Sequence, residues 1–278
     1  MTDDFEPHRQ FLIGVAYRML GSLAEAEDIV QDAFLRWSET DRSVVDHPRA
    51  FLARVVSRLC LDHMKSATSR REQYVGTWLP EPMVAPRTEP YAEDLSFALL
   101  LTLERLSPLE RAAFLLHDVF DMDYSAIAET LGRSEASCRQ LAARAREHVR
   151  EERPRFSATD ESRAKLTEAF TAAMTSEDFD VLAQLLADDA VLYQDGGGKR
   201  VAARHPIHGK DKIVRFFSTV KKSATAVLEH VEPVHINGLP GFVIRTSAGL
   251  ETISFDTAND QIIAIYSIRN PDKLRHLS

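Results

Sequence analysis

The sequence has 278 residues, of which 44% are hydrophobic and 27% charged, and its formal net charge is −8. These values are typical of a globular protein with two or three domains. No run of about 18 apolar residues occurs, which argues against a membrane-spanning protein. The first residues include Asp3, Asp4 and Glu6 in place of the basic start of a secretory signal, so we expect none.

Two cysteines, Cys60 and Cys138, fall within helical patterns. We expect buried thiols in a reducing cytoplasm and no disulfide. The negative net charge argues weakly against nucleic-acid binding, because phosphate contacts need lysine and arginine. A binding face is a local property, however, so the question is whether the basic residues cluster.

Residues 1–75 are predicted to form a helical module. Apolar residues recur at helical spacing over 11–19 and 26–37, and a third helix is predicted over 49–65. That third helix carries apolar side chains on one face and Arg54, Arg58 and Lys65 on another. A basic face of this kind indicates either a DNA-facing helix or a solvated surface.

Residues 76–93 differ in composition, because Pro80, Pro82, Pro86 and Pro90 fall within them. Proline removes a backbone donor and fixes φ, so we predict an extended linker. Trp78 is unusual in such a stretch, and exposing a large aromatic ring to water is costly. We therefore expect it to dock on another part of the protein.

Residues 94–152 are predicted to form a second helical module. Ser107, Pro108 and Glu110 have the spacing of a capping box at the start of a helix that continues through Leu116. A short helix over 125–131, a turn at Gly132 and a longer helix capped by Ser134 have the pattern of a helix-turn-helix. The outer face of the longer helix carries Arg139, Gln140, Ala143 and Arg144, and arginine and glutamine can pair with base edges in the major groove.

Residues 153–160 are predicted to be a second linker, and residues 161–278 an α+β domain. Helices are predicted over 164–174, 179–186 and 210–220. Strands are predicted over 190–193, 201–203, 227–236, 242–246, 250–255 and 262–268, with the first two joined by a turn over 195–199. Helices followed by an antiparallel meander are typical of the α+β class.

Three strings in the helical part resemble the extracytoplasmic-function (ECF) sigma factors of bacterial transcription. Residues 26–34 (AEDIVQDAF) resemble the polymerase-binding helix of that family. Residues 106–111 (LSPLER) and 124–132 (YSAIAETLG), followed by Arg144 to Glu147, resemble its promoter-binding module. The resemblance covers residues 5–152, with the two modules in the right order.

The resemblance implies a role for each basic or acidic cluster. Asp28, Gln31, Asp32 and Phe34 match positions that grip core RNA polymerase. Arg54, Arg58 and Lys65 match the region that reads the minus-ten promoter element, and Ser137, Arg139, Gln140 and Arg144 match the minus-thirty-five recognition helix. The implied partners are core RNA polymerase and promoter DNA, and the resemblance implies no enzyme activity, cofactor, metal or membrane contact.

The rest of the chain resembles a subgroup of that family with a C-terminal SnoaL-like cone domain. The resemblance rests on residues 78–82 (WLPEP), 195–199 (DGGGK) and 270–274 (NPDKL). The implied fold is two all-α modules followed by an α+β SnoaL-like domain.

Two functions remain open for the C-terminal domain, because this fold hosts enzymes and binders alike. In an enzyme such as an isomerase or cyclase, Asp195 would be a general base assisted by Tyr193, Tyr266 or a histidine. Asp before three glycines is more typical of a turn, however. In a built-in regulator the domain would bind the first linker through a tethered interface. A bound small molecule is compatible with either. The regulatory residues would be Trp78, Leu79, Pro80, Asp195, Gly196, Gly197, Gly198, Lys199, Asn270, Pro271, Asp272, Lys273 and Leu274.

Overall fold

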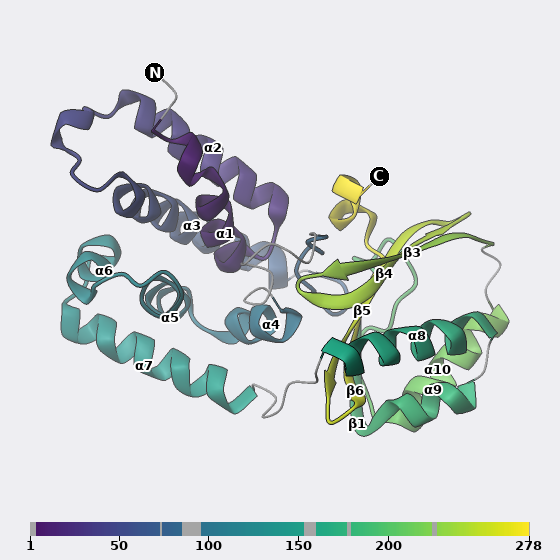
Figure 1. The fold of residues 1–278 in the computed structure, drawn as a ribbon. Coiled ribbons are helices and arrows are strands. Elements are labelled where there is room, and N and C mark those ends of the chain that lie inside the picture. The colour runs from purple at the N-terminus through teal and green to yellow at the C-terminus, as the bar shows by residue number, and fades with distance from the viewer. Residues whose placement is uncertain are drawn as a thin grey trace. The chain divides into compact units, whose positions relative to one another are not determined.

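The computed structural model describes residues 4–72, 74–84, 96–152, 160–176, 179–223 and 227–277 (Figure 1). They divide into two compact units, which we describe separately. The helical unit comprises residues 1–72 and 98–153, and the C-terminal unit comprises residues 73–97 and 154–278. Parts of both predicted linkers, residues 85–93 and 153–159, lie outside the described residues.

The first module of the helical unit contains η1 (Glu6–His8), α1 (Arg9–Leu20), α2 (Leu23–Glu39), η2 (Arg42–Val44) and α3 (Pro48–Glu72). Gly21 ends α1 with a left-handed φ of 70°. Ser22 then caps α2 by accepting a hydrogen bond from the Glu25 amide. The three long helices pack against one another.

The second module contains α4 (Phe97–Arg105), α5 (Pro108–Phe114), η4 (Leu115–Val119), α6 (Tyr124–Leu131) and α7 (Glu135–Glu152). The predicted capping box between Ser107 and Glu110 is present at the start of α5. Gly132 ends α6 with a φ of 63°, and the turn leads into α7 as predicted. One detail differs, because the helix begun by α5 widens into the π-helix η4 at Leu115.

The C-terminal unit contains three helices, α8 (Asp160–Ser176), α9 (Phe179–Leu185) and α10 (Lys210–Ser223), among its described residues. Its sheet has the strand order β2-β1-β6-β5-β4-β3. The strands are β1 (Leu186–Asp195), β2 (Ile207–His208), β3 (Leu228–Ile236), β4 (Leu239–Thr246), β5 (Gly249–Ala258) and β6 (Gln261–Ile268). Two single-turn 3-10 helices, η5 (Pro271–Lys273) and η6 (Arg275–Leu277), follow the sheet, and we call residues 270–277 the tail.

The predicted antiparallel meander is present over β3 to β6, but one prediction about this sheet was wrong and one strand pairing was not predicted. Strand β1 pairs in parallel with β6, so only β3 to β6 form an antiparallel meander. Residues 201–203 are not a returning strand, since the antiparallel partner of β1 is β2. The backbone of residues 201–203 bonds to side chains instead: Ala203 donates its amide to the Gln194 side chain, and Arg269 donates to the Val201 carbonyl.

The core of this domain lies between one face of the sheet and the helices α8, α9 and α10 (Figure 1). Phe170 of α8 stands at its centre, with its ring centroid 5.1 Å from that of Phe255 and 6.2 Å from that of Phe242. All three rings are buried. Among the described residues, no helix has both the length and the apolar character to cross a membrane.

The two tryptophans of the sequence allow each unit to be followed separately, because Trp37 lies in the helical unit and Trp78 in the C-terminal unit. Phe255→Ala removes a fully buried ring, and we expect it to lower the free energy of unfolding of the C-terminal unit by about 3–5 kcal/mol. In a Trp37→Phe background, the urea midpoint reported by Trp78 should fall. In a Trp78→Phe background, the midpoint reported by Trp37 should not change. An equal fall of both midpoints would contradict the division into two units.

Candidate functional site

A fully buried carboxylate, that of Asp195, lies where β1 ends. Its Oδ1 accepts hydrogen bonds from the Tyr74 hydroxyl and from the Gly197 amide at 3.0 Å. Its Oδ2 accepts from the Leu79 amide at 2.9 Å and from Lys273 Nζ at 2.7 Å. A carboxylate has about four acceptor positions, so this one is saturated.

Lys273, in the tail, is the buried cation that balances this charge. Its ammonium also donates to the Leu79 carbonyl. It lies 4.1 Å from the ring centroid of Trp78 and 5.0 Å from that of Tyr74. A buried ion pair is tolerated only when its remaining hydrogen-bonding capacity is satisfied, and these contacts satisfy it.

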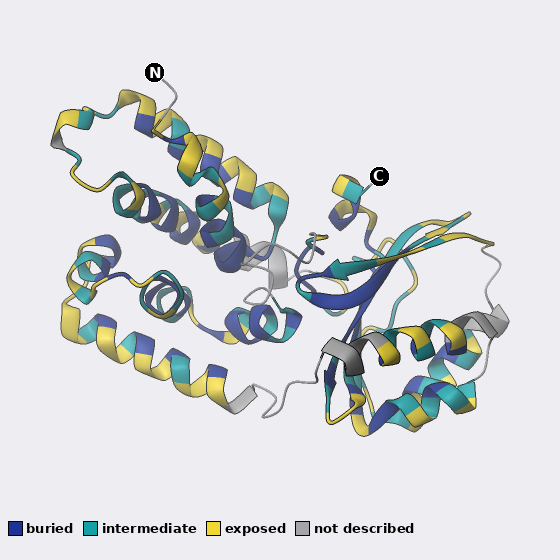
Figure 2. Cartoon of the chain, in the orientation of Figure 1, coloured by how far each residue is buried: buried dark blue, intermediate teal, exposed yellow. Residues whose placement is uncertain are grey.

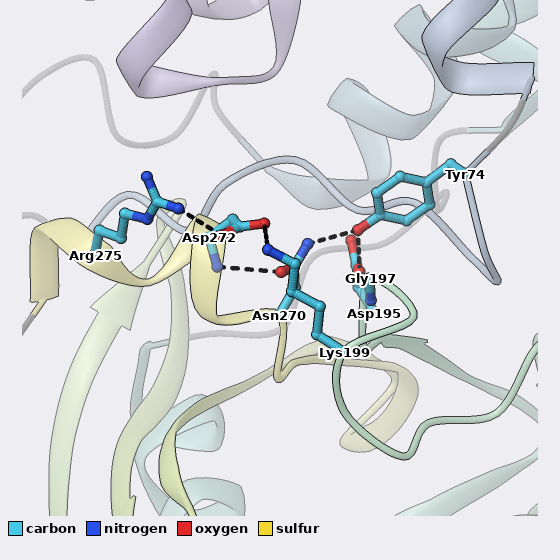
Figure 3. Close-up of polar contacts among 7 residues, drawn as sticks. All are labelled: Tyr74, Asp195, Gly197, Lys199, Asn270, Asp272 and Arg275. Atoms are coloured by element: carbon cyan, nitrogen blue, oxygen red, sulfur yellow. Dashed lines mark hydrogen bonds and ion pairs between the residues drawn. The ribbon is translucent and has the colours of Figure 1, made fainter.

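Asn270 extends the network from the tail (Figure 3). Its side-chain amide donates to the Tyr74 hydroxyl at 2.8 Å, and its carbonyl oxygen accepts from the Asp272 amide at 3.1 Å. Burial, together with the hydrogen bond to Asp195, raises the pKa of Tyr74 well above its usual value. Tyr74 therefore stays protonated and donates to the carboxylate.

The exposed rim of the network is a second set of charges (Figure 3). Asp272 accepts from Lys199 and from Arg275, the latter at 2.6 Å. The hydrogen bond from Lys199 lowers the pKa of Asp272 below its ordinary value. Since all three side chains are in contact with water, these pairs add little to stability.

Each glycine of residues 195–199, which we call the glycine turn, is required for a different reason. A Cβ on Gly196 would overlap the Arg200 carbonyl. A Cβ on Gly197 would overlap the Asn270 side chain, and one on Gly198 would lie 3.1 Å from Cβ of Val75. Gly197 and Gly198 also have positive φ. The turn therefore fits closely against both the tail and the segment that contains Val75.

That segment is residues 73–96, which join α3 to α4 and which we call the connector. Its residues 74–84 contact the C-terminal domain along their length. Beyond Leu79, Pro82 accepts a hydrogen bond from His276, and Met83 exchanges two hydrogen bonds of 2.9 Å with Asn237. Val84 then forms a single β-bridge with Ile236.

The other end of the connector leads to Phe97, which belongs to the same unit. Its ring stacks on Tyr266 of β6 with the centroids 4.9 Å apart, and Tyr266 in turn stacks on Tyr193 at 5.5 Å. Phe97 and Tyr266 are both buried. The C-terminal domain therefore holds the chain on both sides of residues 85–95.

These contacts do not fit the enzyme interpretation. A general base needs a free acceptor that reaches substrate, and all four acceptor positions of Asp195 are occupied inside the protein. Tyr266, an expected assistant, is buried in the aromatic stack, where burial raises its pKa well above the usual value. No group of three potential metal ligands occurs among the described residues.

The expected polymerase-binding residues lie on α2, and Figure 2 shows exposed residues, in yellow, along this helix. Asp28, Gln31 and Asp32 are exposed. Phe34 is half-buried because its ring packs edge-on against Phe5, with the centroids 5.2 Å apart. The adjacent Leu35 is the exposed apolar side chain, at 52% exposure, and sequence reasoning missed it.

The expected DNA-binding arginines of α3 contact α6 instead of facing solvent freely. Arg54 forms an ion pair with Glu129. Arg58 donates to the Glu129 carbonyl at 2.6 Å and to the Thr130 carbonyl at 3.1 Å. Lys65 lies apart from these contacts, exposed and paired with Asp62 at 2.8 Å.

Arg111, which sequence reasoning missed, makes a further contact between the two helical modules. Its side chain is buried and donates to the Met19 carbonyl at the end of α1, at 2.6 Å. It also bonds Glu104 at 2.8 Å. A guanidinium at a helix C-terminus satisfies a carbonyl that has no partner within the helix.

The expected base-reading residues of α7 are mostly free for a partner. Arg139, Gln140 and Arg144 are exposed, and Ser137 is half-buried. Arg139 pairs with Glu135 at 2.6 Å and lies 5.1 Å from the ring centroid of Tyr124. Because this ion pair is exposed, breaking it costs little free energy.

A helix-turn-helix with an exposed Arg/Gln face, preceded by a three-helix module, is the architecture of a DNA-binding transcription factor. Residues 5–70 match the family model for sigma-70 region 2, and residues 96–149 match that for sigma-70, region 4. The chain is 40% identical to the ECF RNA polymerase sigma factor SigJ of Mycobacterium tuberculosis, over 98% of this chain and 92% of that protein. The probable ECF sigma factor SigI of the same species is 39% identical over 64% of each chain.

A crystal structure of M. tuberculosis SigJ matches with a TM-score of 0.78 at 36% identity, covering 99% of this chain and 98% of that one. The chain belongs to the ECF RNA polymerase sigma factors. The expected fold class, two all-α modules followed by an α+β SnoaL-like domain, is confirmed.

Asp195→Asn should weaken the binding of the connector, because it leaves the Lys273 ammonium buried without its counter-ion. Removing one partner of a buried pair costs about 3–5 kcal/mol. We expect that loss in urea unfolding followed by Trp78 in a Trp37→Phe background. Asp272→Asn, in the exposed rim, is the matched control and should cost less than about 1 kcal/mol.

A double variant tests the pairing itself. Asp195→Asn with Lys273→Met removes both charges, so it should cost less than the sum of the two single variants. Strictly additive costs, or equal costs at Asp195 and Asp272, would contradict the assignment of Asp195 and Lys273 as the pair that holds the connector.

Proposed function

We propose that the C-terminal domain regulates this sigma factor in cis by binding the connector between its two promoter-binding modules. As an ECF sigma factor, the chain binds core RNA polymerase and directs it to promoters, a role that we assign to the cytoplasm. The observation that carries the proposal is the saturated Asp195 carboxylate, which receives the Tyr74 hydroxyl and the Leu79 amide of the connector.

The length of the connector explains why its binding to the C-terminal domain would limit promoter recognition. The connector is 24 residues long, since α3 ends at Glu72 and α4 begins at Phe97. Fully extended, it reaches about 80 Å at 3.3–3.6 Å per residue. Two promoter elements about 20 base pairs apart are separated by about 70 Å at 3.4 Å per pair. Promoter binding therefore needs an extended connector, and a connector bound through residues 74–84 is not available for extension.

The contacts between α3 and α6 provide a second restraint, within the helical unit. Arg54 and Arg58 are the arginines that we assign to the minus-ten element, and both bond to Glu129. A promoter phosphate or base must replace these contacts. The contacts with α6 therefore withhold DNA-binding side chains, while the binding of residues 74–84 to the C-terminal domain withholds connector length.

We assign the remaining roles as the family resemblance implies. Asp28, Gln31, Asp32 and Phe34 would contact core polymerase, with Leu35 added by its exposure. Arg54, Arg58 and Lys65 would contact the minus-ten element, and Ser137, Arg139, Gln140 and Arg144 the minus-thirty-five element. The domains would be region 2 at 1–75, region 4 at 94–152 and the regulatory domain at 161–278, joined by linkers at 76–93 and 153–160.

In the docked state, residues 74–84 are bound to the C-terminal domain, and in the open form they are released. Core polymerase shifts this equilibrium towards the open form if it binds that form more tightly. The apparent affinity for core is then reduced by the fraction of molecules that are open. The C-terminal domain sets that fraction through the strength with which it binds residues 74–84.

The double variant Trp78→Ala, Leu79→Ala tests this control. Leu79 is fully buried, and Trp78 carries the ring beneath Lys273, so both truncations weaken docking. We expect a larger radius of gyration in solution scattering and a Kd for core polymerase lowered by about 10- to 100-fold, the range expected if 90–99% of molecules are docked. Val84→Ala, at the exposed end of the docked segment, is the control and should change neither. A double variant as compact as the parent, with unchanged core affinity, would refute the proposal.

Glu129→Gln and Arg54→Ala separate the two roles of Arg54. Glu129→Gln removes the restraint and leaves the arginine, so promoter binding by the polymerase complex should rise, by at most about fivefold for an exposed ion pair. Arg54→Ala removes the restraint and also the DNA contact, so binding to promoters should fall. The assay is a salt titration of promoter affinity, since loss of a phosphate contact lowers the salt slope. Equal effects of the two variants would show that Arg54 contacts only α6 and makes no contact with DNA.

A further inference from the structure

A cavity of about 330 Å³ lies between the glycine turn and the connector. Val75 and Gly76 of the connector form one wall, and the turn with the loop that follows it forms the others. Its volume falls at the small end of the range of about 300–1,000 Å³ that is typical of ligand pockets. The cavity lies outside the helix-covered core of the domain, which Phe170, Phe242 and Phe255 fill.

The charged residues that line the cavity are all positively charged. Lys199, Arg200 and Arg204 line it, and none of its lining residues is a carboxylate. Lys199 is paired with Asp272, and Arg200 donates to the Ala248 carbonyl. Arg204 is exposed, and within the described part of the chain it has no ion-pair partner. The other lining side chains are chiefly small and apolar.

The loop over 200–204 is held in place without belonging to the sheet. Arg269 donates to the Val201 carbonyl at 2.6 Å, and the Ala203 amide donates to the side chain of the buried Gln194 at 3.0 Å. The cavity wall is therefore ordered before any ligand arrives, which lowers the entropic cost of binding.

We propose that this cavity binds a small organic oxyanion, a carboxylate or phosphate ester with a compact apolar part. A guanidinium presents a planar fork of donors that matches either oxyanion, and no described residue forms an ion pair with Arg204. The apolar part of the ligand would lie against Val75, Val201 and Ala202.

The ligand would favour the docked connector, a step that rests on the proposed function. Val75 and Gly76 complete the cavity only while the connector is bound, so the oxyanion binds the docked state more tightly than the open one. It therefore shifts the equilibrium towards the docked state and lowers the affinity for core polymerase.

The experiment titrates the full-length protein with phenyl phosphate, benzoate and the neutral benzyl alcohol, and follows the amides of Gly76, Val201 and Ala202 by NMR. We expect saturable shifts with either or both anions and none with the alcohol. Arg204→Gln should weaken anion binding about tenfold or more, as the loss of a charged hydrogen bond does. Arg215→Gln, which changes an exposed arginine of α10 outside the cavity, should have no effect. Val201→Glu, at a site 85% exposed, should abolish binding through like-charge repulsion.

Failure of the site and failure of the regulation give different results. Chemical-shift changes that are absent at about 10 mM anion, where a site of millimolar Kd is filled, or a Kd that is unchanged in Arg204→Gln, overturn the site. Binding that leaves core affinity unchanged overturns the coupling. If the Trp78→Ala, Leu79→Ala variant also leaves core affinity unchanged, the proposed function itself has failed.

Discussion

The hydrogen bonds to one buried carboxylate, that of Asp195, join three segments that lie far apart in the sequence. The connector contributes Tyr74 and Leu79, the glycine turn contributes Gly197, and the tail contributes Lys273. When the connector leaves, Asp195 loses two of its four donors but keeps its counter-ion. Each lost hydrogen bond to a charged group corresponds to about 1.5–3 kcal/mol, and water partly replaces it. The contact is therefore strong enough to hold the connector and weak enough for a tightly binding partner to displace it.

Local signals in the sequence predicted most of the helical part. Gly21 and Gly132 end helices through positive φ, and Ser22 and Ser107 begin helices through side-chain caps. Each of these depends on residues within one or two turns, so it can be recognised in the sequence without knowledge of distant contacts. The three strings at residues 78–82, 195–199 and 270–274 also meet in the structure. That meeting was inferred from resemblance and from the solvation cost of Trp78, and not from any periodic pattern.

What the sequence could not predict depends on distant partners. Residues 201–203 have strand-forming composition in part, but Gln194 and Arg269 satisfy their backbone, and neither interaction has a local signature. Tyr74 precedes the proline-rich stretch, so nothing marked it as a donor to Asp195. Helical periodicity identifies the polar face of α3, but it cannot tell whether Arg54 and Arg58 meet DNA or the end of α6. The parallel pairing of β1 with β6 likewise depends on the whole domain that lies between them in sequence.

Amide hydrogen exchange at Leu79 tests the central claim most directly. This amide is buried and donates to Asp195 Oδ2, so in the free protein it should exchange slowly, at a rate set by the release of the connector. On binding core polymerase it should lose that protection, while the amide of Phe255 in the core of the C-terminal domain keeps its own. Protection of Leu79 that survives in the polymerase complex would show that the connector stays bound to the C-terminal domain during initiation, and would contradict regulation by its release.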